Sequence, residues 1–358
     1  MIRVAIVGSG FAADLHAQSL TATGRAQVCG VTSTRDESRA DFGRRWSCAD
    51  YATVAEMLDR ESPDAITLAM PNAHHLAATS EAAMRGIHVI CEKPLARTMA
   101  EAARMVSLCD EAGVHLLYAE QLCFAPRYRR VKELIDAGAL GRIIQINHWE
   151  RHNGPHARWF YDPALSGGGV TLDMGCHGIE LMRWLLGKPP VSTVSAHIGT
   201  YLHTDEVVDD HSVVTLTFAD GTRGIADASW AAPGGIDERL EVLGTGGVLK
   251  ADLARGQSML VYSESVTGFA TEKAEHTQGW SWVSHDDAWT WGWRGEFEHF
   301  VDVLADAASP AETGRDGVEV LRLVSAAYAS AATGALITMP YDPGDEAPVD
   351  IWLQRNQR

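Results

Sequence analysis

Three ionisable residues follow three consecutive glycines in the segment GGGVTLDMGCHGIE, which runs from Gly167 to Glu180. If the segment is helical, Asp173, His177 and Glu180 fall on one stripe, because residues four and seven apart share a helix face. Histidine has a pKa suited to taking a proton from an alcohol, and a carboxylate one turn earlier can orient its ring. We therefore interpret His177 as a general acid/base, Asp173 as its support and Glu180 as a structural residue. The alternative is a structural histidine preceded by an aspartate that starts a helix.

The pattern predicts one helix from Val170 to Leu186. Trp184 extends the polar stripe, while apolar residues fill the rest of the surface: Met174, Ile179, Leu181, Met182 and Leu185. A polar edge on an otherwise apolar helix is typical of a lined cleft rather than of a solvated helix. We expect the three glycines to let the chain pass close to a substrate or cofactor as it enters this helix.

Lys93 is a second residue that could do chemistry. It stands between Glu92 and Pro94 in CEKPLA, at the end of the predicted strand IHVICEKP. Ligands bind at the carboxyl ends of strands in open α/β sheets, and an ammonium there would stabilise a developing alkoxide. In this interpretation Pro94 fixes the backbone and Glu92 offers a charge partner. The alternative is an ordinary surface Glu–Lys pair.

A dinucleotide-binding turn is predicted at the start of the chain. The strand IRVAIVG leads into GSGFAA, where Gly8, Gly10 and Ala13 have the G-x-G-x-x-A spacing. This spacing allows a tight turn, close approach of backbone to a pyrophosphate, and close packing of the following helix, whose N-terminus attracts the anion. A βα turn without a ligand is the alternative. The predicted cofactor contacts in this loop are Gly8, Ser9, Gly10, Phe11 and Ala12.

The end of the second predicted strand, AQVCGVTST, bears on the choice of cofactor. An acidic residue there would bind the ribose hydroxyls of NAD, but this chain has Ser33, Thr34 and Arg35. Hydroxyls and a guanidinium suit a 2′-phosphate, so we expect NAD(P) and favour NADP over NAD. Arg35 stacking on adenine, or pointing into solvent, is the alternative.

Strands alternate with helices through the first third of the chain, which indicates a parallel sheet. We predict an N-terminal Rossmann domain, a doubly wound parallel α/β sheet, over residues 1–122. From residue 123 to 345 we predict an α+β domain, and residues 346–358 form a polar tail. This second domain begins with the amphipathic helix FAPRYRRVKELIDAGALG. The strand RIIQINHWE follows, with Ile144, Ile146 and His148 on one face.

The extended runs of the second domain predict a large, mostly antiparallel open sheet. They are VSTVSAHIGTY, DHSVVTLTF, TRGIADASW, RLEVLGTGGVLKADL and SMLVYSE, with a short turn at Ala219-Asp220-Gly221. One face of such a sheet needs a cover. A second subunit is the expected cover, which predicts a homodimer or homotetramer assembled through this sheet.

These segments together resemble the Gfo/Idh/MocA oxidoreductases over essentially the whole chain. The resemblance rests on GSGFAA, MPNAHH, CEKPLA and the G-G-G-x-x-x-D-x-G-x-H pattern. It implies the same two-domain fold, a nicotinamide cofactor, sugar or polyol substrates, and Lys93, Asp173 and His177 as catalytic residues. It adds further expected cofactor residues: Met70, Pro71, Asn72, His75, Glu92 and Lys93. Cys123 departs from the family's R-F-x-P sequence, so any contact made by that arginine must be made differently.

The segment HWERHNGPHARWFYDPALSGGG is interpreted as a substrate loop. His148, His152 and His156 recur every four residues, but Gly154-Pro155 breaks any helix that would align them on a metal. We therefore predict no metal site. We expect substrate contacts from His152, His156 and Trp159 in this loop and from Tyr118 and Glu120 elsewhere.

Five tryptophans lie within GWSWVSHDDAWTWGW, at positions 280, 282, 289, 291 and 293. Stacking on sugar rings and burial in a core or interface are both open interpretations. With His285, Asp286 and Asp287 nearby, the segment could belong to an active site.

The composition excludes several classes of partner. The net charge of −17 argues against nucleic acid and anionic membrane surfaces. No apolar run is long enough to span a bilayer, and no N-terminal signal is visible. Six scattered cysteines without metal-type spacing suggest reduced thiols in a cytoplasmic protein.

Three functions follow from these expectations. The first is an NAD(P)-dependent dehydrogenase or reductase acting on a CH–OH group of a sugar, cyclitol or related polyol. The second is a redox-assisted glycosidase, with Tyr118, Glu120, His148 and Glu150 as further acids or bases. The third is a non-catalytic dinucleotide-binding sensor, since fold alone does not prove activity.

Overall fold

The computed structural model describes residues 1–233, 235–255, 259–263, 279–283 and 286–356. It contains two compact units. The N-terminal unit comprises Met1–Phe124 and Gly292–Glu319, and the C-terminal unit comprises Ala125–Trp291 and Val320–Arg358. Helix α12 (Gly314–Thr333) passes from one to the other.

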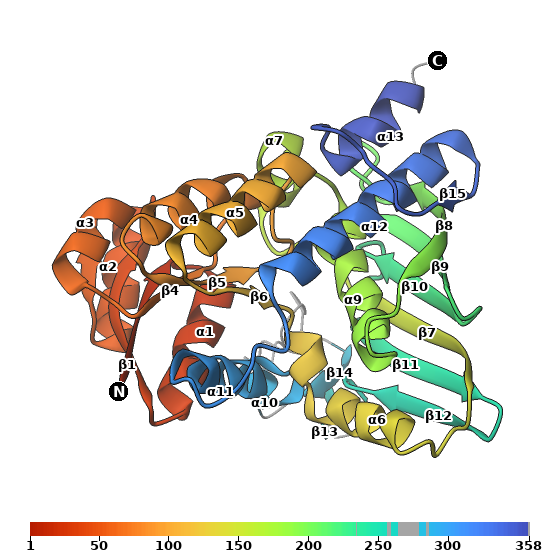
Figure 1. The fold of residues 1–358 in the computed structure, drawn as a ribbon, viewed down its shortest axis with the longest axis horizontal. Helices are drawn as coiled ribbons and strands as arrows, with labels where there is room; N and C mark the ends of the chain where they lie inside the picture. The colour runs from red at the N-terminus through yellow and green to blue at the C-terminus, as the bar shows by residue number, and fades with distance from the viewer. Residues whose placement is uncertain (234, 256–258, 264–278, 284–285, 357–358) are drawn as a thin grey trace. The chain divides into compact units, whose positions relative to one another are not determined.

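The N-terminal unit is built on a six-stranded parallel sheet, which confirms the predicted Rossmann fold (Figure 1). The strand order is β3-β2-β1-β4-β5-β6. Their bounds are β1 Ile2–Val7, β2 Ala26–Thr32, β3 Ala49–Tyr51, β4 Ala65–Leu68, β5 His88–Glu92 and β6 Leu116–Ala119. The helices of the unit are α1 Phe11–Ala22, α2 Asp36–Trp46, α3 Val54–Glu61, α4 His75–Ala83, α5 Met99–Ala112 and α11 Trp293–Leu304, with short 3-10 turns η1 Asn72–His74 and η2 Gln121–Phe124. The order reverses beside β1, and such a switch point is where doubly wound sheets bind ligands.

The C-terminal unit is built on a seven-stranded sheet of order β12-β11-β7-β10-β9-β8-β15. Its pairs are antiparallel except for β10 with β7, which confirms a mostly antiparallel sheet. The strands are β7 Ile143–Arg151, β8 Val191–Gly199, β9 His211–Phe218, β10 Arg223–Ser229, β11 Asp237–Gly244, β12 Gly247–Asp252 and β15 Ile337–Thr338. Strands β13 (Met259–Ser263) and β14 (Gly279–Val283) form a separate two-stranded sheet.

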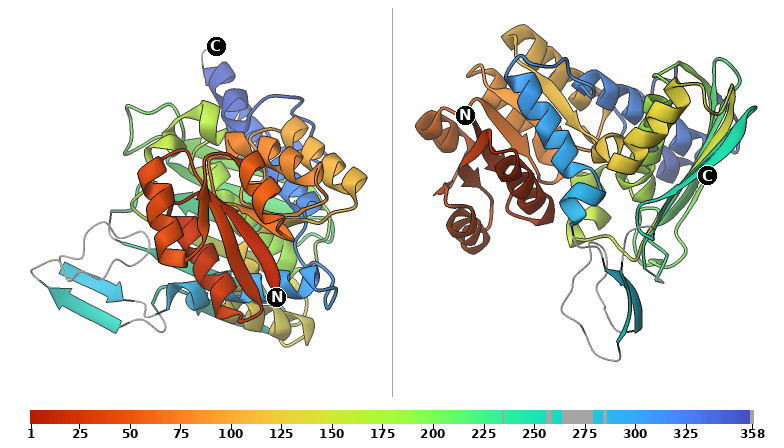
Figure 2. Two further views of the ribbon diagram at one scale, coloured as in Figure 1. Left: turned by 90° about the vertical axis from the view of Figure 1, so that its left-hand side faces the viewer. Right: turned by 90° about the horizontal axis from the view of Figure 1, so that it is seen from below.

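Helices cover one face of the seven-stranded sheet, as Figure 2 shows. Helix α9 packs on β7 and β10, and α6 packs against α9 and β12. The helices and helical turns of the unit are α6 Pro126–Asp136, η3 Arg158–Tyr161, α7 Pro163–Ser166, α8 Val170–Asp173, α9 Gly175–Leu185, α10 Asp287–Thr290 and α13 Pro348–Asn356. Within the described part of the chain, no helix has both the length and the apolar character needed to cross a bilayer.

The prediction that Ile144 shares a strand face with Ile146 and His148 is wrong. Ile143 and Ile146 are buried, whereas the Ile144 side chain is 39% exposed. The pairing of β7 with β11 shifts between Leu243 and Gly244, so the bulge skips Ile144 and turns Ile143 inward.

The predicted helix over 170–186 is interrupted. Helix α8 ends at Asp173 and α9 begins at Gly175, with Met174 between them at φ −106° and ψ −35°. Glu180 is fully buried and pairs with Arg183 and, at 3.3 Å, with the Lys188 ammonium. The carboxylate therefore stabilises the end of α9, as expected of a structural residue.

The three glycines fit a crowded interior. Gly167 ends α7 with φ +82°, a conformation that favours glycine. A Cβ on Gly168 would lie 2.9 Å from the Tyr328 hydroxyl, and one on Gly169 would lie 2.1 Å from the Asp209 carbonyl oxygen. Glycine is required here because the chain passes close to Asp209 and Tyr328. The expected close approach to a substrate or cofactor stays a prediction.

Asp209 is the buried anchor of this turn. Its Oδ1 accepts hydrogen bonds from the amide of Gly169 at 3.1 Å and from the Tyr328 hydroxyl. Its Oδ2 accepts from the amide and hydroxyl of Thr171 at 2.8 and 2.5 Å. Burial raises the pKa of Asp209, while these donors act in the opposite direction. The network fixes the first turn of α8, two residues before Asp173.

Substituting Gly169→Ala tests this packing. The new methyl would overlap the Asp209 backbone, so we expect a loss of roughly 1–3 kcal/mol in the free energy of unfolding. Gly175→Ala is the matched control, because its Cβ would meet Thr171 at an ordinary 3.6 Å. Urea titration followed by circular dichroism should show the first variant destabilised and the second at least as stable as the wild type. Equal stability of the two variants would contradict the packing described.

Candidate functional site

The glycine loop after β1 has the geometry of a phosphate cradle. Gly8 has φ +124°, and a Cβ there would lie 2.0 Å from the Ala69 carbonyl oxygen. No described atom lies within 4 Å of the corresponding position on Gly10, which is the N-cap of α1 and has no side-chain cap. The open space and the helix N-terminus together fit a pyrophosphate. Ala13 is fully buried, as close helix packing requires. The residues Ser9, Phe11 and Ala12 lie in the same loop and first turn.

The end of β2 presents polar groups next to this loop. The Ser9 hydroxyl donates to Ser33 Oγ at 2.9 Å. Arg39 is occupied, because it donates to the Ser33 carbonyl and pairs with Asp36 and Asp50. Thr34 and Arg35 are exposed; the Arg35 carbonyl accepts from the Arg39 amide at 2.9 Å, whereas its guanidinium makes no hydrogen bond or ion pair with any residue that the structure describes. The guanidinium of Arg35 is therefore accessible to a ligand.

His75 holds two turns of the N-terminal unit together. Its Nε2 lies 3.0 Å from the Met70 carbonyl oxygen and its Nδ1 lies 3.1 Å from that of Leu95. The ring is fully buried, and burial lowers its pKa. The imidazole positions the MPN turn and the CEKPLA turn. Of the other predicted cofactor residues there, Asn72 is buried and Met70 and Pro71 are half-buried.

Lys93 is anchored through its backbone. Its amide donates to Glu92 Oε2 at 3.0 Å, while Glu92 Oε1 lies 2.8 Å from His16 Nε2. The other ring nitrogen of His16 lies 2.8 Å from the Thr67 hydroxyl. Glu92 thus binds the Lys93 backbone and His16, a role more specific than the expected charge partner. The Lys93 residue itself is half-buried at the carboxyl end of β5.

Tyr118 and Glu120, both expected to contact substrate, are fully buried at the end of β6. The amide of Tyr118 donates to the Glu312 carbonyl at 3.4 Å, and Glu120 Oε1 accepts from the amide of Leu122 at 3.4 Å. Their contact with a substrate stays a prediction.

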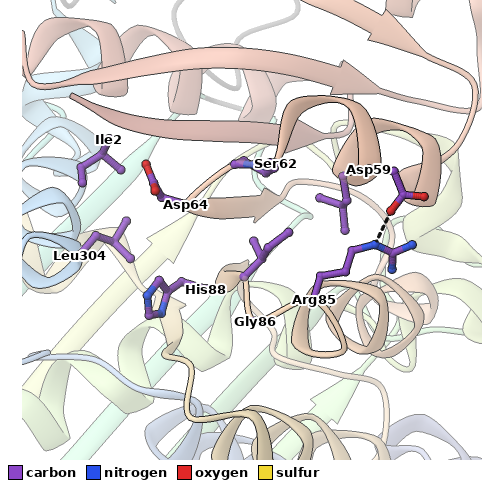
Figure 3. A pocket seen from close by; sticks show the side chains of 11 residues that line it. Ile2, Asp59, Ser62, Asp64, Arg85, Gly86, His88 and Leu304 are labelled. Atoms are coloured by element: carbon purple, nitrogen blue, oxygen red, sulfur yellow. Dashed lines mark hydrogen bonds and ion pairs between the residues drawn. The ribbon is translucent and has the colours of Figure 1, made fainter.

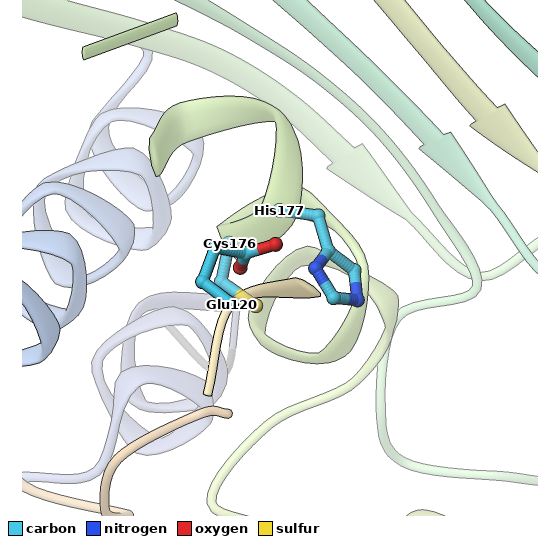
Figure 4. A group of neighbouring side chains, drawn as sticks. All are labelled: Glu120, Cys176 and His177. Carbon is cyan, nitrogen blue, oxygen red and sulfur yellow. The ribbon is translucent and has the colours of Figure 1, made fainter. Parts of the chain in front are cut away.

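Asp173 and His177 stand on either side of the break between α8 and α9. Both are nearly buried, at 8% and 1% exposure. Trp230 Nε1 donates to Asp173 Oδ2 at 3.3 Å, and the His177 amide donates to the Met174 carbonyl at 3.1 Å. Figure 4 shows His177 beside Cys176 in the first turn of α9. A buried imidazole at a helix start and a carboxylate fixed by an indole suit proton transfer.

The predicted substrate loop is ordered by aromatic contacts. The rings of His152 and His156 stack at 5.4 Å, with His152 buried and His156 exposed. Trp159 is half-buried and stacks on Phe160 at 3.8 Å. Phe160 in turn meets Trp230 edge-on at 6.1 Å. Trp230 thereby links the loop to Asp173.

His148 belongs to a separate buried network. Its Nε2 lies 2.7 Å from Glu238 Oε1, which also accepts from the Tyr128 hydroxyl at 2.9 Å. Burial opposes the charge, but the charge and hydrogen bond of Glu238, together with the charges of Glu150 and Asp227, outweigh it and raise the pKa of His148. A Cβ on Gly178 would lie 2.7 Å from His148 Nδ1, so α9 rests directly on this ring. Among the described residues, His148, His152 and His156 do not share a group with metal-binding geometry.

The tryptophan-rich segment is only partly described. The side chains at positions 280, 282 and 285 lie outside the described residues. Trp289 is 43% exposed, whereas Trp291 and Trp293 are buried, and Trp293 packs edge-on against Phe11 at 6.3 Å. Asp286 caps α10 by accepting from the amide of Trp289 at 2.9 Å. Trp291 and Trp293 therefore have core roles.

A cavity of about 550 Å³ lies at the opposite end of the parallel sheet from the glycine loop. Ile2, Asp64 and His88 line it where strands begin (Figure 3). Its arginine, Arg85, already donates to Asp59 at 2.8 Å. Ligands of such sheets bind at the carboxyl ends, so this cavity is not the candidate site.

Three positioning residues escaped sequence reasoning: His16, Asp209 and Trp230. Each acts on a residue far along the chain, at separations of 76, 38 and 57 positions from Glu92, Thr171 and Asp173. The one available signal was residue type, since a histidine and a tryptophan in otherwise apolar elements need hydrogen-bond partners when buried.

Comparison with known proteins gives matches over both units. Residues 2–120 match the oxidoreductase family with an NAD-binding Rossmann fold, and residues 128–250 match the GFO/IDH/MocA C-terminal domain. The crystal structure of GenD2 from gentamicin A biosynthesis, in complex with NAD, is 33% identical with a TM-score of 0.89. The match covers 95% of this chain and 97% of that one.

Curated relatives extend the comparison. D-xylose 1-dehydrogenase (NADP(+)) 2 of Haloferax volcanii is 28% identical over 86% of this chain and 90% of its own. Myo-inositol 2-dehydrogenase of Thermotoga maritima is 25% identical over 92% of this chain and 96% of its own. The predicted resemblance is confirmed: the chain belongs to the Gfo/Idh/MocA family and is an NAD(P)-dependent oxidoreductase.

Proposed function

We propose that the protein transfers a hydride between a nicotinamide cofactor and a hydroxyl carbon of a sugar, cyclitol or related polyol. One observation supports this proposal above the others: the chain combines an uncapped helix after the glycine loop with the three candidate catalytic residues Lys93, Asp173 and His177. The Lys93 backbone is held by Glu92, and the Asp173 side chain is held by Trp230. Relatives named as xylose and inositol dehydrogenases support the substrate class.

The three side chains have distinct roles in this proposal. The bound nicotinamide accepts or supplies the hydride. His177 takes the hydroxyl proton during oxidation and returns it during reduction, while Asp173, fixed by Trp230, stabilises the imidazolium. The Lys93 ammonium stabilises the alkoxide as the proton leaves. We also propose that His152, His156 and Trp159 contact the substrate hydroxyls and ring face.

For the cofactor we propose a preference for NADP. The accessible guanidinium of Arg35, beside Ser33 and Thr34, supports binding of a 2′-phosphate. Relatives include both types, since the GenD2 structure holds NAD and the Haloferax enzyme is named for NADP(+).

We further propose a cytoplasmic homodimer or homotetramer assembled through the open face of the seven-stranded sheet. Ile144, Leu243 and Val248 are exposed, and Leu243 pairs directly with Val248 across β11 and β12. Neighbouring exposed apolar residues support an interface. The six scattered cysteines, without metal-type spacing, support reduced thiols in a cytoplasmic protein.

The substrate class is tested by a panel of sugars, cyclitols and amino-substituted sugars, with absorbance read at 340 nm. Amino sugars are included because one relative serves gentamicin A biosynthesis. We expect stoichiometric cofactor reduction with at least one class. Product formation without net reduction would support the redox-assisted glycosidase instead, and dinucleotide binding without any turnover would support the sensor.

His177→Ala tests the proton-transfer role. Loss of the general base should lower kcat about 10²- to 10⁴-fold, while dinucleotide binding, measured by fluorescence titration, stays unchanged. His197→Ala, at an exposed position on β8, is the control and should keep full activity. Full hydride transfer by the His177 variant would remove the assignment.

Arg35→Ala tests the cofactor preference. A lost charge-assisted hydrogen bond to phosphate should weaken NADP binding roughly ten- to hundredfold and leave NAD binding unchanged. Arg44→Ala, on helix α2 which follows Arg35, is the control, because its side chain is 70% exposed and pairs with Asp41. Equal effects on both dinucleotides would argue against a 2′-phosphate contact.

The double substitution Leu243→Glu with Val248→Glu tests the interface. Two carboxylates on the apolar patch should dissociate the assembly, which sedimentation velocity will detect as a smaller species. Met84→Glu, at an exposed residue of the N-terminal unit, is the control. An unchanged sedimentation coefficient in the double variant would place the interface elsewhere.

A further inference from the structure

His16 joins three elements of the N-terminal unit at one buried point. It lies on α1, five residues after the first residue of that helix, and its ring is fully buried. Its nitrogens reach Thr67 on β4 and Glu92 at the end of β5, each at 2.8 Å. The ring of Phe297, from α11, packs on it at a centroid distance of 4.7 Å.

The hydrogen bonds have a consistent direction. The Lys93 amide can only donate, so Glu92 Oε2 is an acceptor. With an ionised Glu92, His16 Nε2–H donates to Oε1 and Nδ1 accepts from the Thr67 hydroxyl. A neutral imidazole in this tautomer satisfies every group in the chain. Glu92 then receives a donor on each carboxylate oxygen.

The surroundings make the second donor important. Three further carboxyl groups, those of Glu120, Glu296 and Glu312, are fully buried in the same unit. Both carboxyl oxygens of Glu296 lack a hydrogen-bond partner among the described residues. Burial, followed by the charges of Glu92, Glu120 and Glu312, raises its pKa well above the ordinary value. In such a crowded acidic region a buried carboxylate needs its hydrogen-bond donors, and the loss of one leaves a buried oxygen unsatisfied.

We propose that His16 is a positioning residue for Lys93, acting through Glu92. The imidazole supplies the donor that orients the Glu92 carboxylate, and the second Glu92 oxygen then holds the Lys93 amide. Because His16 lies on the helix that follows the glycine loop, it also ties the cofactor-loop helix to the lysine turn. The inference rests on the proposed function for its catalytic consequence, but its structural part does not.

Two substitutions distinguish the roles of the two ring nitrogens of His16. In His16→Gln, the amide nitrogen takes the place of Nε2 and can still donate to Glu92. In His16→Asn, the shorter amide reaches only toward Thr67. Hydrogen exchange at the Lys93 amide, read by mass spectrometry of peptides spanning residues 91–96, needs no substrate. Losing a hydrogen bond to a charged group should speed this exchange roughly ten- to hundredfold in His16→Asn, with near wild-type exchange in His16→Gln.

Activity gives the second readout. With the substrate found in the panel, His16→Asn should lower kcat about tenfold or more with dinucleotide affinity little changed, and His16→Gln should restore most of it. Unchanged Lys93 exchange in a folded His16→Asn protein, or equal acceleration in both variants, would overturn the proposal. If no substrate is found, the proposed function fails while the exchange result still stands.

Glu92→Gln covers the case in which His16→Asn does not fold. A neutral amide at residue 92 has one acceptor oxygen for two donors, so Lys93 exchange should again rise roughly tenfold or more. His16→Phe keeps a ring but removes both nitrogens, so it should speed Lys93 exchange by itself and cause no further acceleration when added to Glu92→Gln, because both changes act on one chain of hydrogen bonds. Additive effects would show that His16 and Lys93 are independent and would overturn the proposal.

Discussion

A carboxylate removed from water must receive hydrogen bonds, and each unit of this protein uses one such carboxylate to fix the backbone beside a candidate catalytic residue. In the C-terminal unit, Asp209 binds the amides of Gly169 and Thr171, ahead of Asp173. In the N-terminal unit, Glu92 binds the amide of Lys93 and the ring of His16. The Lys93 amide is a sequence neighbour of Glu92, but the His16 ring and the amides of Gly169 and Thr171 lie 38 to 76 residues from the carboxylate they bind, so both networks form only when the fold is complete.

This arrangement separates support from chemistry. The buried acids accept hydrogen bonds from backbone amides, whereas the groups proposed to react are the side chains of Lys93 and His177. A catalytic side chain works best when its neighbours fix its geometry without occupying its reacting atom. Trp230 positions Asp173 in the same way, because its indole donates to one carboxylate oxygen of Asp173. The Trp230 ring also packs edge-on against Phe160 of the aromatic loop.

Local patterns predicted most of the fold and the identities of the candidate residues. The glycine loop, the CEKPLA turn and the alternating strands are short-range signals, since each follows from spacing within a few residues. The break at Met174, the bulge at Ile144 and the packing of the glycine triplet were missed. The bulge and the packing of the glycines depend on partners such as Asp209, Tyr328 and β11, which are 39 to 159 residues away in sequence and invisible to local spacing. The return of Gly292–Glu319 to the N-terminal unit is likewise a tertiary feature.

The most direct test of the account follows the hydride itself. A substrate found in the panel is prepared with deuterium on the carbon that bears the reacting hydroxyl, and the nicotinamide is recovered after one turnover. Mass spectrometry should show one deuterium in each reduced cofactor molecule, with the oxidised product in equal amount. Reduced cofactor without deuterium, or product formed while the cofactor stays oxidised, would contradict direct hydride transfer by this protein.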